Sequence, residues 1–166
     1  MKKILTILGA LAVVAMFSMG ATIDTYSGSN ATPSKYSVAD SADTNGVGVD
    51  LWGYYGALVV VEVGAAGSTF LADSTVLELE LEESADNSSF TDVADAHLVG
   101  YVAGTNDGCF GVVNAAADDS TTYYASYIGS LRYIRIVTNY TGDAPDGITP
   151  VSGTVIRMHP MYGPAH

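Results

Sequence analysis

The sequence predicts an all-β protein, an antiparallel β-sandwich or jelly-roll-like fold in a single domain with an extended N-terminal arm. Eighteen glycines and eleven tyrosines in 166 residues, with many valines and threonines, favour strands and tight turns over helices. No window beyond residue 60 shows a convincing helical repeat of 3.6 residues. Roughly six to eight strand-like segments follow one another at short spacing, separated by turns rich in Gly, Asn and Asp.

Residues 1–21, MKKILTILGALAVVAMFSMGA, have a basic start, an apolar run and then small residues. Ser18 and Gly20 fit the pattern of a cleavage site, so the segment has the form of a secretory signal peptide. The apolar run is too short and too rich in Gly and Ala for a stable membrane span. The alternative is an apolar arm that is retained and buried against another subunit. The sequence leaves both open, and cleavage would make the protein secreted.

The rest of the chain divides by composition. Residues 22–46 are rich in Ser, Thr, Asn, Asp and Ala and contain few large apolar residues, which predicts a polar linker or arm. The β-sandwich domain is expected at residues 47–160, and residues 161–166 are a C-terminal tail. Strands are expected at 57–63, 74–84, 90–93, 97–102, 120–129, 131–142 and 152–160.

Residues 77–82 alternate Leu and Glu strictly, which places three leucines on one face of a strand and three glutamates on the other. The leucines are expected in the core. Glu78, Glu80 and Glu82 are expected to form either a solvated surface or a contact with a basic patch on another subunit. Arg135 is the best partner for them within the chain, because it points away from the core face of its own strand.

Six basic residues stand against eighteen acidic ones, which gives a formal net charge of −12. A field of that sign repels nucleic acid and anionic membranes, so a nucleic-acid-binding role is excluded. Most of these charges are expected to lie on a solvated acidic surface.

Catalytic motifs are missing from the sequence: it has no nucleophile elbow, no phosphate-binding loop and no zinc-protease helix. No two of its histidines, His97, His159 and His166, have the spacing of metal ligands. Cys109 lies between a turn and an apolar run and is expected to be a buried small hydrophobic residue. We therefore expect a protein that is not an enzyme and uses no cofactor.

A calcium site is the one metal site that the sequence suggests. Asp40, Asp43, Asn45 and Asp50 lie close together and offer oxygen ligands of the kind that calcium prefers. Their spacing does not match an EF-hand loop, and turn chemistry explains Asp and Asn next to Gly equally well. No metal site is therefore assigned.

Four segments carry a resemblance to a known group: GVDLWGYYGALVVVEVG, LELEESADNSSFTDV, YIGSLRYIRIVTNYTG and VIRMHP. Together they resemble small β-rich proteins encoded beside capsid genes in tailed bacteriophages and prophages, over about residues 46–160. The resemblance implies a virion structural protein on the capsid surface, a decoration or cement protein that binds the major capsid protein or other virion subunits. It also implies a homo-oligomer, with a trimer favoured because decoration sites commonly have local threefold symmetry.

The turn and the strand of the second and third segments also resemble discoidin-like carbohydrate-binding sandwiches, which have a Ser-x-Asp/Asn-x-Ser-x-Phe turn and an Arg-Tyr-Ile-Arg-Ile strand. This resemblance implies a secreted or surface-bound binding module. Its recognition loops would need exposed aromatic side chains. Trp52, Tyr54 and Tyr55 are the candidates, although packing in the core is the commoner role for such residues.

Overall fold

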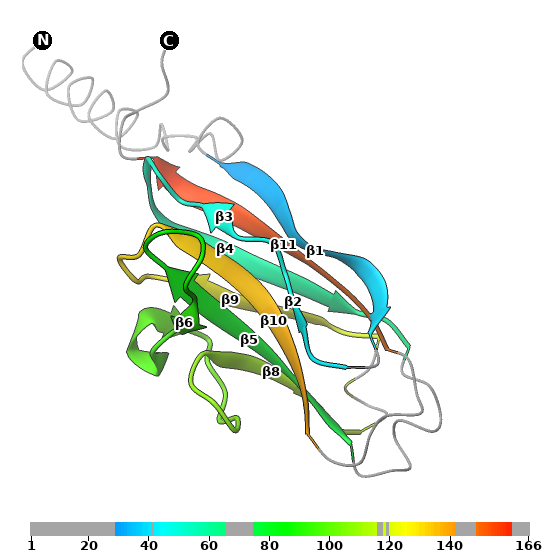
Figure 1. Ribbon diagram of the computed structural model, residues 1–166. Helices are drawn as coiled ribbons and strands as arrows, with labels where there is room; N and C mark the ends of the chain where they lie inside the picture. Colours follow the sequence, from blue (N-terminus) through cyan, green and yellow to red (C-terminus); the bar gives the residue numbers. More distant parts are fainter. Residues whose placement is uncertain are drawn as a thin grey trace, which may run out of the picture.

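The computed structural model of the chain describes residues 29–40, 42–65, 75–115, 118, 120–141 and 149–160. In this part the chain forms two antiparallel sheets that lie against each other (Figure 1), and the predicted all-β sandwich is confirmed. None of the described residues belongs to a helix long and apolar enough to cross a membrane. The segment 1–21 and the tail 161–166 lie outside these residues, so both interpretations of the N-terminal segment stay predictions.

The first sheet has five strands in the order β1-β11-β4-β9-β7. They are β1 (Asn30–Asp40), β11 (Thr149–Pro160), β4 (Tyr54–Val63), β9 (Thr122–Tyr127) and β7 (Leu98–Val99). The Val-rich β4 is the central strand, because it pairs with β11 on one side and β9 on the other. Strands β1 and β7 are therefore the two edges of this sheet.

The second sheet has six strands, with β10 and β5 at its centre. They are β2 (Thr44–Asn45), β3 (Val49–Asp50), β5 (Val76–Ser84), β6 (Thr91–Asp92), β8 (Cys109–Val113) and β10 (Tyr133–Thr141). Strands β10 and β5 pair without a break from Tyr133 opposite Ser84 to Thr141 opposite Val76. A short 3-10 turn, η1 (Asp95–His97), connects β6 to β7.

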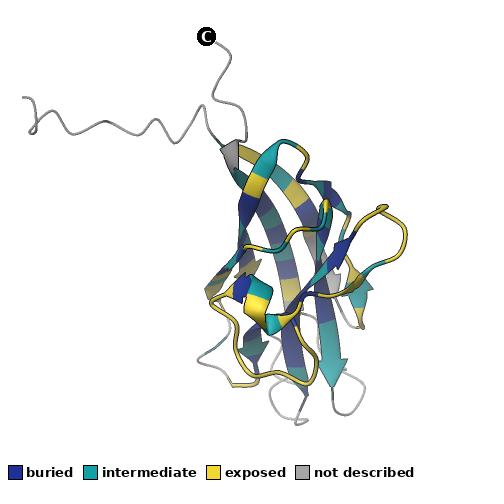
Figure 2. Ribbon diagram, turned by 90° about the vertical axis from the view of Figure 1, so that its left-hand side faces the viewer, coloured by how far each residue is buried: buried dark blue, intermediate teal, exposed yellow. Residues whose placement is uncertain are grey.

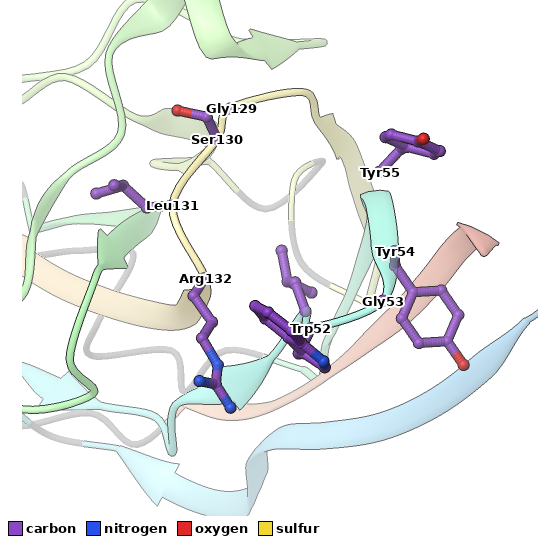
Figure 3. Close-up of a pocket in the computed structure, with 9 residues that line it drawn as sticks. Trp52, Gly53, Tyr54, Tyr55, Gly129, Ser130, Leu131 and Arg132 are labelled. Atoms are coloured by element: carbon purple, nitrogen blue, oxygen red, sulfur yellow. The ribbon is translucent and has the colours of Figure 1, made fainter. Parts of the chain in front are cut away.

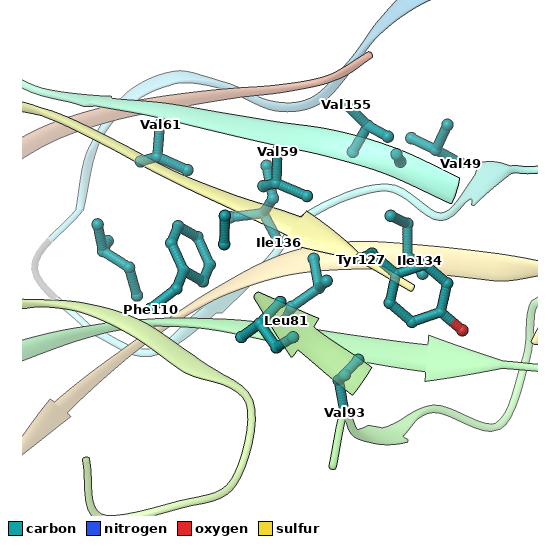
Figure 4. Close-up of a cluster of buried hydrophobic side chains, with 14 of the residues drawn as sticks. Val49, Val59, Val61, Leu81, Val93, Phe110, Tyr127, Ile134, Ile136 and Val155 are labelled. Carbon is teal, nitrogen blue, oxygen red and sulfur yellow. The ribbon is translucent and has the colours of Figure 1, made fainter. Parts of the chain in front are cut away.

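The core lies between the two sheets and is built from the apolar residues of alternating strand positions. Buried residues concentrate on the strands and exposed residues on the loops (Figure 2). Leu77, Leu79 and Leu81 are 0% exposed, as the alternation predicts. Side chains such as Val59 and Ile136 meet from opposite sheets (Figure 4). Each fully buried Val, Leu or Ile contributes roughly 1.5–3 kcal/mol to folding, so this layer is the main source of stability.

The predicted polar linker at 22–46 is wrong from residue 30 onward, because β1 pairs along its length with β11. The strand escaped the sequence pattern because its inward positions include the polar residues Ser34 and Lys35. The Ser34 hydroxyl donates to the Val47 carbonyl and accepts from the Ile136 amide, at 2.8 and 3.0 Å. Side-chain hydrogen bonds thus replace apolar contacts here, and the sandwich begins before Val47.

Candidate binding site

Two loops at one end of the sandwich enclose a hollow with a volume of about 400 Å³. One is the turn that leads into β4, and the other connects β9 to β10 (Figure 3). The hollow is lined by Leu51, Trp52, Gly53, Tyr54, Tyr55, Gly129, Ser130, Leu131 and Arg132. These residues include all three aromatic side chains that the sequence marks as candidates, and we call this region the aromatic hollow.

A tight turn presents Trp52 to solvent. The Tyr54 amide donates to the Leu51 carbonyl at 2.9 Å, which closes a four-residue turn. Gly53 occupies its third position with a φ of 86°, a conformation that glycine adopts at little cost. The Asp50 carboxylate accepts from the Trp52 amide at 2.8 Å and fixes the entry to the turn. Trp52 is consequently 76% exposed.

Arg132 joins the second loop to this turn. Its guanidinium donates twice to the Asp50 carboxylate, at 3.0 and 2.7 Å, and lies 5.1 Å from the centroid of the Trp52 ring. The Leu51 amide also donates to the Arg132 carbonyl at 2.7 Å. The hydrogen bonds from Arg132 hold the pKa of Asp50 below its usual range, so this carboxyl stays ionised. Because the pair is exposed, it orients Trp52 more than it stabilises the fold.

Tyr54 and Tyr55 leave β4 in different directions (Figure 3). The guanidinium of Arg157 lies 5.2 Å from the centroid of the Tyr54 ring and donates to the Asp50 carbonyl at 3.1 Å. Tyr55 is 66% exposed. The interpretation that these aromatic residues pack in the core is therefore wrong for Trp52 and Tyr55, and Tyr54 is half-buried against Arg157.

The aromatic hollow is suited to binding. Exposed aromatic rings can stack on a planar or apolar group, and the Ser130 hydroxyl and nearby backbone groups can form hydrogen bonds. Of the nine lining residues, Arg132 is the charged one, and Asp50 already engages it. The lining offers no nucleophile paired with a base, the arrangement that nucleophilic catalysis needs.

The glutamate row lies elsewhere, on the outer face of the six-stranded sheet. Glu78 is 4% and Glu80 is 0% exposed, so the prediction of a solvated face is wrong for both. The Thr105 amide donates to both carboxylate oxygens of Glu78, at 2.9 and 3.0 Å. The Asn106 side chain donates to Glu80 at 3.2 Å, and Asn139 also donates to it. The loop around residues 104–106 therefore covers these carboxylates from within the same chain.

Burial raises the pKa of Glu80 to about 7, against the hydrogen bond from Asn106, which lowers it. The nearby carboxylates of Asp92 and Glu78 raise this pKa further. Cys109, opposite Glu80 in the strand register, is buried and free, as predicted. Burial raises the pKa of its thiol to about 11, which leaves it protonated and inert at neutral pH.

The third glutamate has the partner that the sequence predicts. Arg135 lies directly opposite Glu82 in the register of β10 and β5, and its Nε donates to Glu82 Oε2 at 2.5 Å. The same guanidinium lies 4.2 Å from the centroid of the Phe90 ring. The prediction that Arg135 is the partner is confirmed, and all three glutamates are bound within the chain.

Sequence reasoning missed Arg132, although it is central to the aromatic hollow. The available signal was indirect: Gly53 after Trp52 marks a turn, and an aromatic residue on a turn is often exposed. The pairing of that turn with Arg132 depends on the tertiary arrangement, because Asp50 and Arg132 are far apart in the sequence. The glutamates and the aromatic residues, the two groups of interaction residues that the sequence suggests, lie on different parts of the sandwich.

Two of the four suggested calcium ligands, Asp50 and Asp43, are engaged in other contacts. Asp50 binds Arg132, and Asp43 accepts from the Tyr140 amide at 2.7 Å. Within the described part of the chain, no group of three or more His, Cys, Asp or Glu side chains is arranged to hold a metal ion. The side chain of Asp40 lies outside the described residues.

Comparisons with known proteins give only distant likenesses. No protein-family model matches the chain, and no curated protein matches it. Among solved structures, the SPBc2 prophage-derived protein YomS is 15% identical, with a TM-score of 0.41, over 77% of this chain and 94% of that chain. Turnip yellow mosaic virus is 14% identical, with a TM-score of 0.35, over 81% and 82% of the two chains. Desmodium yellow mottle tymovirus is 8% identical, with a TM-score of 0.33, over 83% and 91%. Likenesses at this level carry no conclusion about function, which rests on the residues of this chain.

Proposed function

We propose that this chain is a non-enzymatic virion structural protein that decorates or cements a capsid by binding the major capsid protein or another virion subunit. The observation that carries the proposal is the exposed stack of Trp52 and Arg132 in the aromatic hollow. Trp, Tyr and Arg are the residues that dominate binding energy at protein interfaces. The resemblance of residues 46–160 to small phage head proteins supports the kind of partner.

The rigidity of the stack supports a binding role. Trp52 is held by its own turn, by Asp50 and by Arg132, so little conformational entropy is lost when a partner covers it. The acidic surface suits a part that faces solvent, away from packaged nucleic acid.

The test is sedimentation of purified protein with particles that lack it. Trp52→Ala is expected to weaken attachment by roughly tenfold or more, the loss typical of an interface anchor. The control is Tyr101→Ala, which removes another exposed aromatic ring, 53% exposed, away from the aromatic hollow. Equal attachment of both variants and the wild type would overturn the assignment of this surface.

A carbohydrate-binding module is the second candidate. It is favoured by exposed aromatic rings beside a hollow of about 400 Å³, an arrangement on which sugar rings can stack. Titration with a panel of glycans decides between the two. Saturable glycan binding that is lost in Trp52→Ala, together with no attachment to particles, would replace the virion proposal.

The fate of residues 1–21 separates a location in the virion from a secreted one. Mass spectrometry of the mature protein tests whether residues 1–21 are retained. Retention supports an apolar arm anchored against a neighbouring virion subunit, since several buried Leu or Val side chains would each contribute about 1.5–3 kcal/mol. A start at Ala21 or Thr22 indicates a cleaved signal and favours the secreted alternative.

A further inference from the structure

The segment between β7 and β8 lies over the acidic face of the six-stranded sheet. We call its residues 101–107 the cover loop, and all of them are exposed. The loop is attached to the sheet by two side-chain contacts. The Thr105 amide and hydroxyl donate to Glu78, and the Asn106 side chain donates to Glu80. Both glutamates are buried beneath it.

The cover loop also shields Cys109, the single cysteine of the chain. Cys109 lies opposite Glu80 in the register of β8 and β5, so both side chains belong to the outer face of the sheet. A Cβ on Gly104 would lie 2.6 Å from Cys109 Cβ and 2.7 Å from its Sγ, so the backbone of the loop lies directly on this side chain. The accessibility of Cys109 therefore reports whether the loop is in place.

Glu80 is buried without a charged partner. Its two donors, Asn106 and Asn139, are neutral amides, and among the described residues no ion pair includes Glu80. Arg135, the arginine of this face, is bound to Glu82. The other titratable side chains around Glu80 come from several elements and are all acidic groups: Glu78 and Glu82 on β5, Asp92 on β6, Asp95 on η1, Asp107 in the cover loop and Cys109 on β8.

We propose that Glu80 and the cover loop form a pH-operated switch, in which protonated Glu80 is compatible with the closed loop and ionised Glu80 favours an open loop that exposes Cys109. A buried carboxylate with neutral donors and acidic neighbours loses its hydration without gaining an opposite charge. Opening of the loop returns water to Glu80 and lowers that cost.

The direction of the switch follows from proton linkage. Burial raises the pKa of Glu80 from 4.5 to about 7, so the closed loop binds this proton more tightly than the open loop does. The open population therefore grows as the pH rises from about 4.5 to about 7. The contacts of Thr105 with Glu78 oppose opening, so we expect the open loop to stay a minor state.

The inference is independent of the proposed function, because the aromatic hollow is lined by other residues. The experiment is the labelling of Cys109 in the full chain with an aromatic disulfide, between pH 5 and pH 7. The ratio of the wild-type rate to the Glu80→Gln rate cancels the intrinsic pH dependence of the thiol, since both proteins carry the same thiol. We expect this ratio to rise by roughly tenfold over the range.

Glu82→Gln is the matched control. It makes the same substitution two residues further along β5, at a glutamate that is bound by Arg135 and not by the cover loop. We expect its labelling to follow the pH profile of the wild type. A ratio of wild type to Glu80→Gln that does not change with pH, or a Glu82→Gln profile as flat as that of Glu80→Gln, would overturn the proposal.

Hydrogen exchange of the wild type gives a second readout that needs no variant. After correction for the intrinsic pH dependence of exchange, protection of the Thr105 amide is expected to fall by roughly tenfold from pH 5 to pH 7. At each pH this amide is expected to exchange faster than the amides of the central strand β4, because the loop opens while the sandwich stays folded. Protection of Thr105 that is independent of pH, or exchange as slow as that of β4, would overturn the switch.

Discussion

The two outer faces of the sandwich carry opposite kinds of side chain. The six-stranded sheet presents the acidic residues Glu78, Glu80 and Glu82, and each of them is bound by a group from the same chain. The outer face of the five-stranded sheet presents Val60 and Tyr124, and Tyr124 is 70% exposed. Carboxylates on a sheet face are thus compatible with burial when the chain supplies its own donors, whereas single apolar side chains on a sheet face are tolerated in water without a cover.

The largest expected effect comes from a substitution at Gly108, where the backbone lies close to β5. Gly108 has a φ of 78°, and a Cβ there would lie 2.6 Å from the Leu81 carbonyl oxygen. Gly108→Ala therefore adds both backbone strain and a clash, and we expect the free energy of unfolding to fall by about 2–4 kcal/mol. Urea denaturation followed by circular dichroism measures the change.

The control for that substitution is Gly53→Ala in the aromatic hollow. Gly53 also has a positive φ, 86°, but a Cβ there would meet no atom within 4 Å. Gly53→Ala therefore measures the free-energy cost of the backbone conformation alone, about 1 kcal/mol. Equal losses at both positions would contradict the close approach of Gly108 to β5.

The second prediction concerns pH, and it follows from the burial of Glu80. Its native pKa of about 7 lies above its ordinary value of 4.5, so the folded chain binds this proton more tightly than the unfolded chain does. The stabilisation is complete below pH 4.5 and is lost as the pH rises to about 7. We expect the free energy of unfolding to fall by roughly 1–2 kcal/mol between pH 5 and pH 7.

Glu80→Gln removes the ionisation and is expected to flatten this dependence. Asp92, whose pKa burial also raises, contributes with the same sign in the wild type and the variant. Asp50 and Asp86 have lowered pKa values, so they titrate at a more acidic pH than the range of the test. Denaturation at several pH values measures the slope, and an identical slope in the variant would show that Glu80 is not its source.

The sequence was sufficient to predict which face of β5 enters the core, because strict alternation at residues 77–82 has one apolar side. The partner of Glu82 followed from the same argument applied to Arg135. The cover over Glu78 and Glu80 could not be predicted in this way. It depends on Thr105 and Asn106, which lie in a polar loop whose path over the sheet leaves no local pattern.

Pattern analysis could not predict two features: which polar residues are buried and which aromatic residues are exposed. Strand β1 carries Ser34 and Lys35 inward, and their hydrogen bonds to distant residues are invisible in a hydropathy pattern. Trp52 looks like a core residue by type, but its turn directs it outward beside Arg132. Each case depends on contacts between residues far apart in the chain, which composition and periodicity do not record.

The third prediction compares ion pairs of the two regions. Arg135 and Glu82 are both mostly buried, and Arg135 stacks on Phe90, whereas Arg132 and Asp50 are exposed at the aromatic hollow. A double-mutant cycle with Arg135→Met and Glu82→Gln is expected to give a coupling free energy of about 1 kcal/mol. The cycle with Arg132→Met and Asp50→Asn is expected to give a smaller one. A larger coupling at the exposed pair would contradict the role of burial in this comparison.

The smallest effect on folding is expected on the outer face of the five-stranded sheet. Tyr124 is 70% exposed, so Tyr124→Thr removes little buried area, and threonine is itself well suited to a strand. We expect the free energy of unfolding to change by no more than about 0.5 kcal/mol, measured by urea denaturation. A loss above about 1.5 kcal/mol would show that Tyr124 contributes to the fold itself.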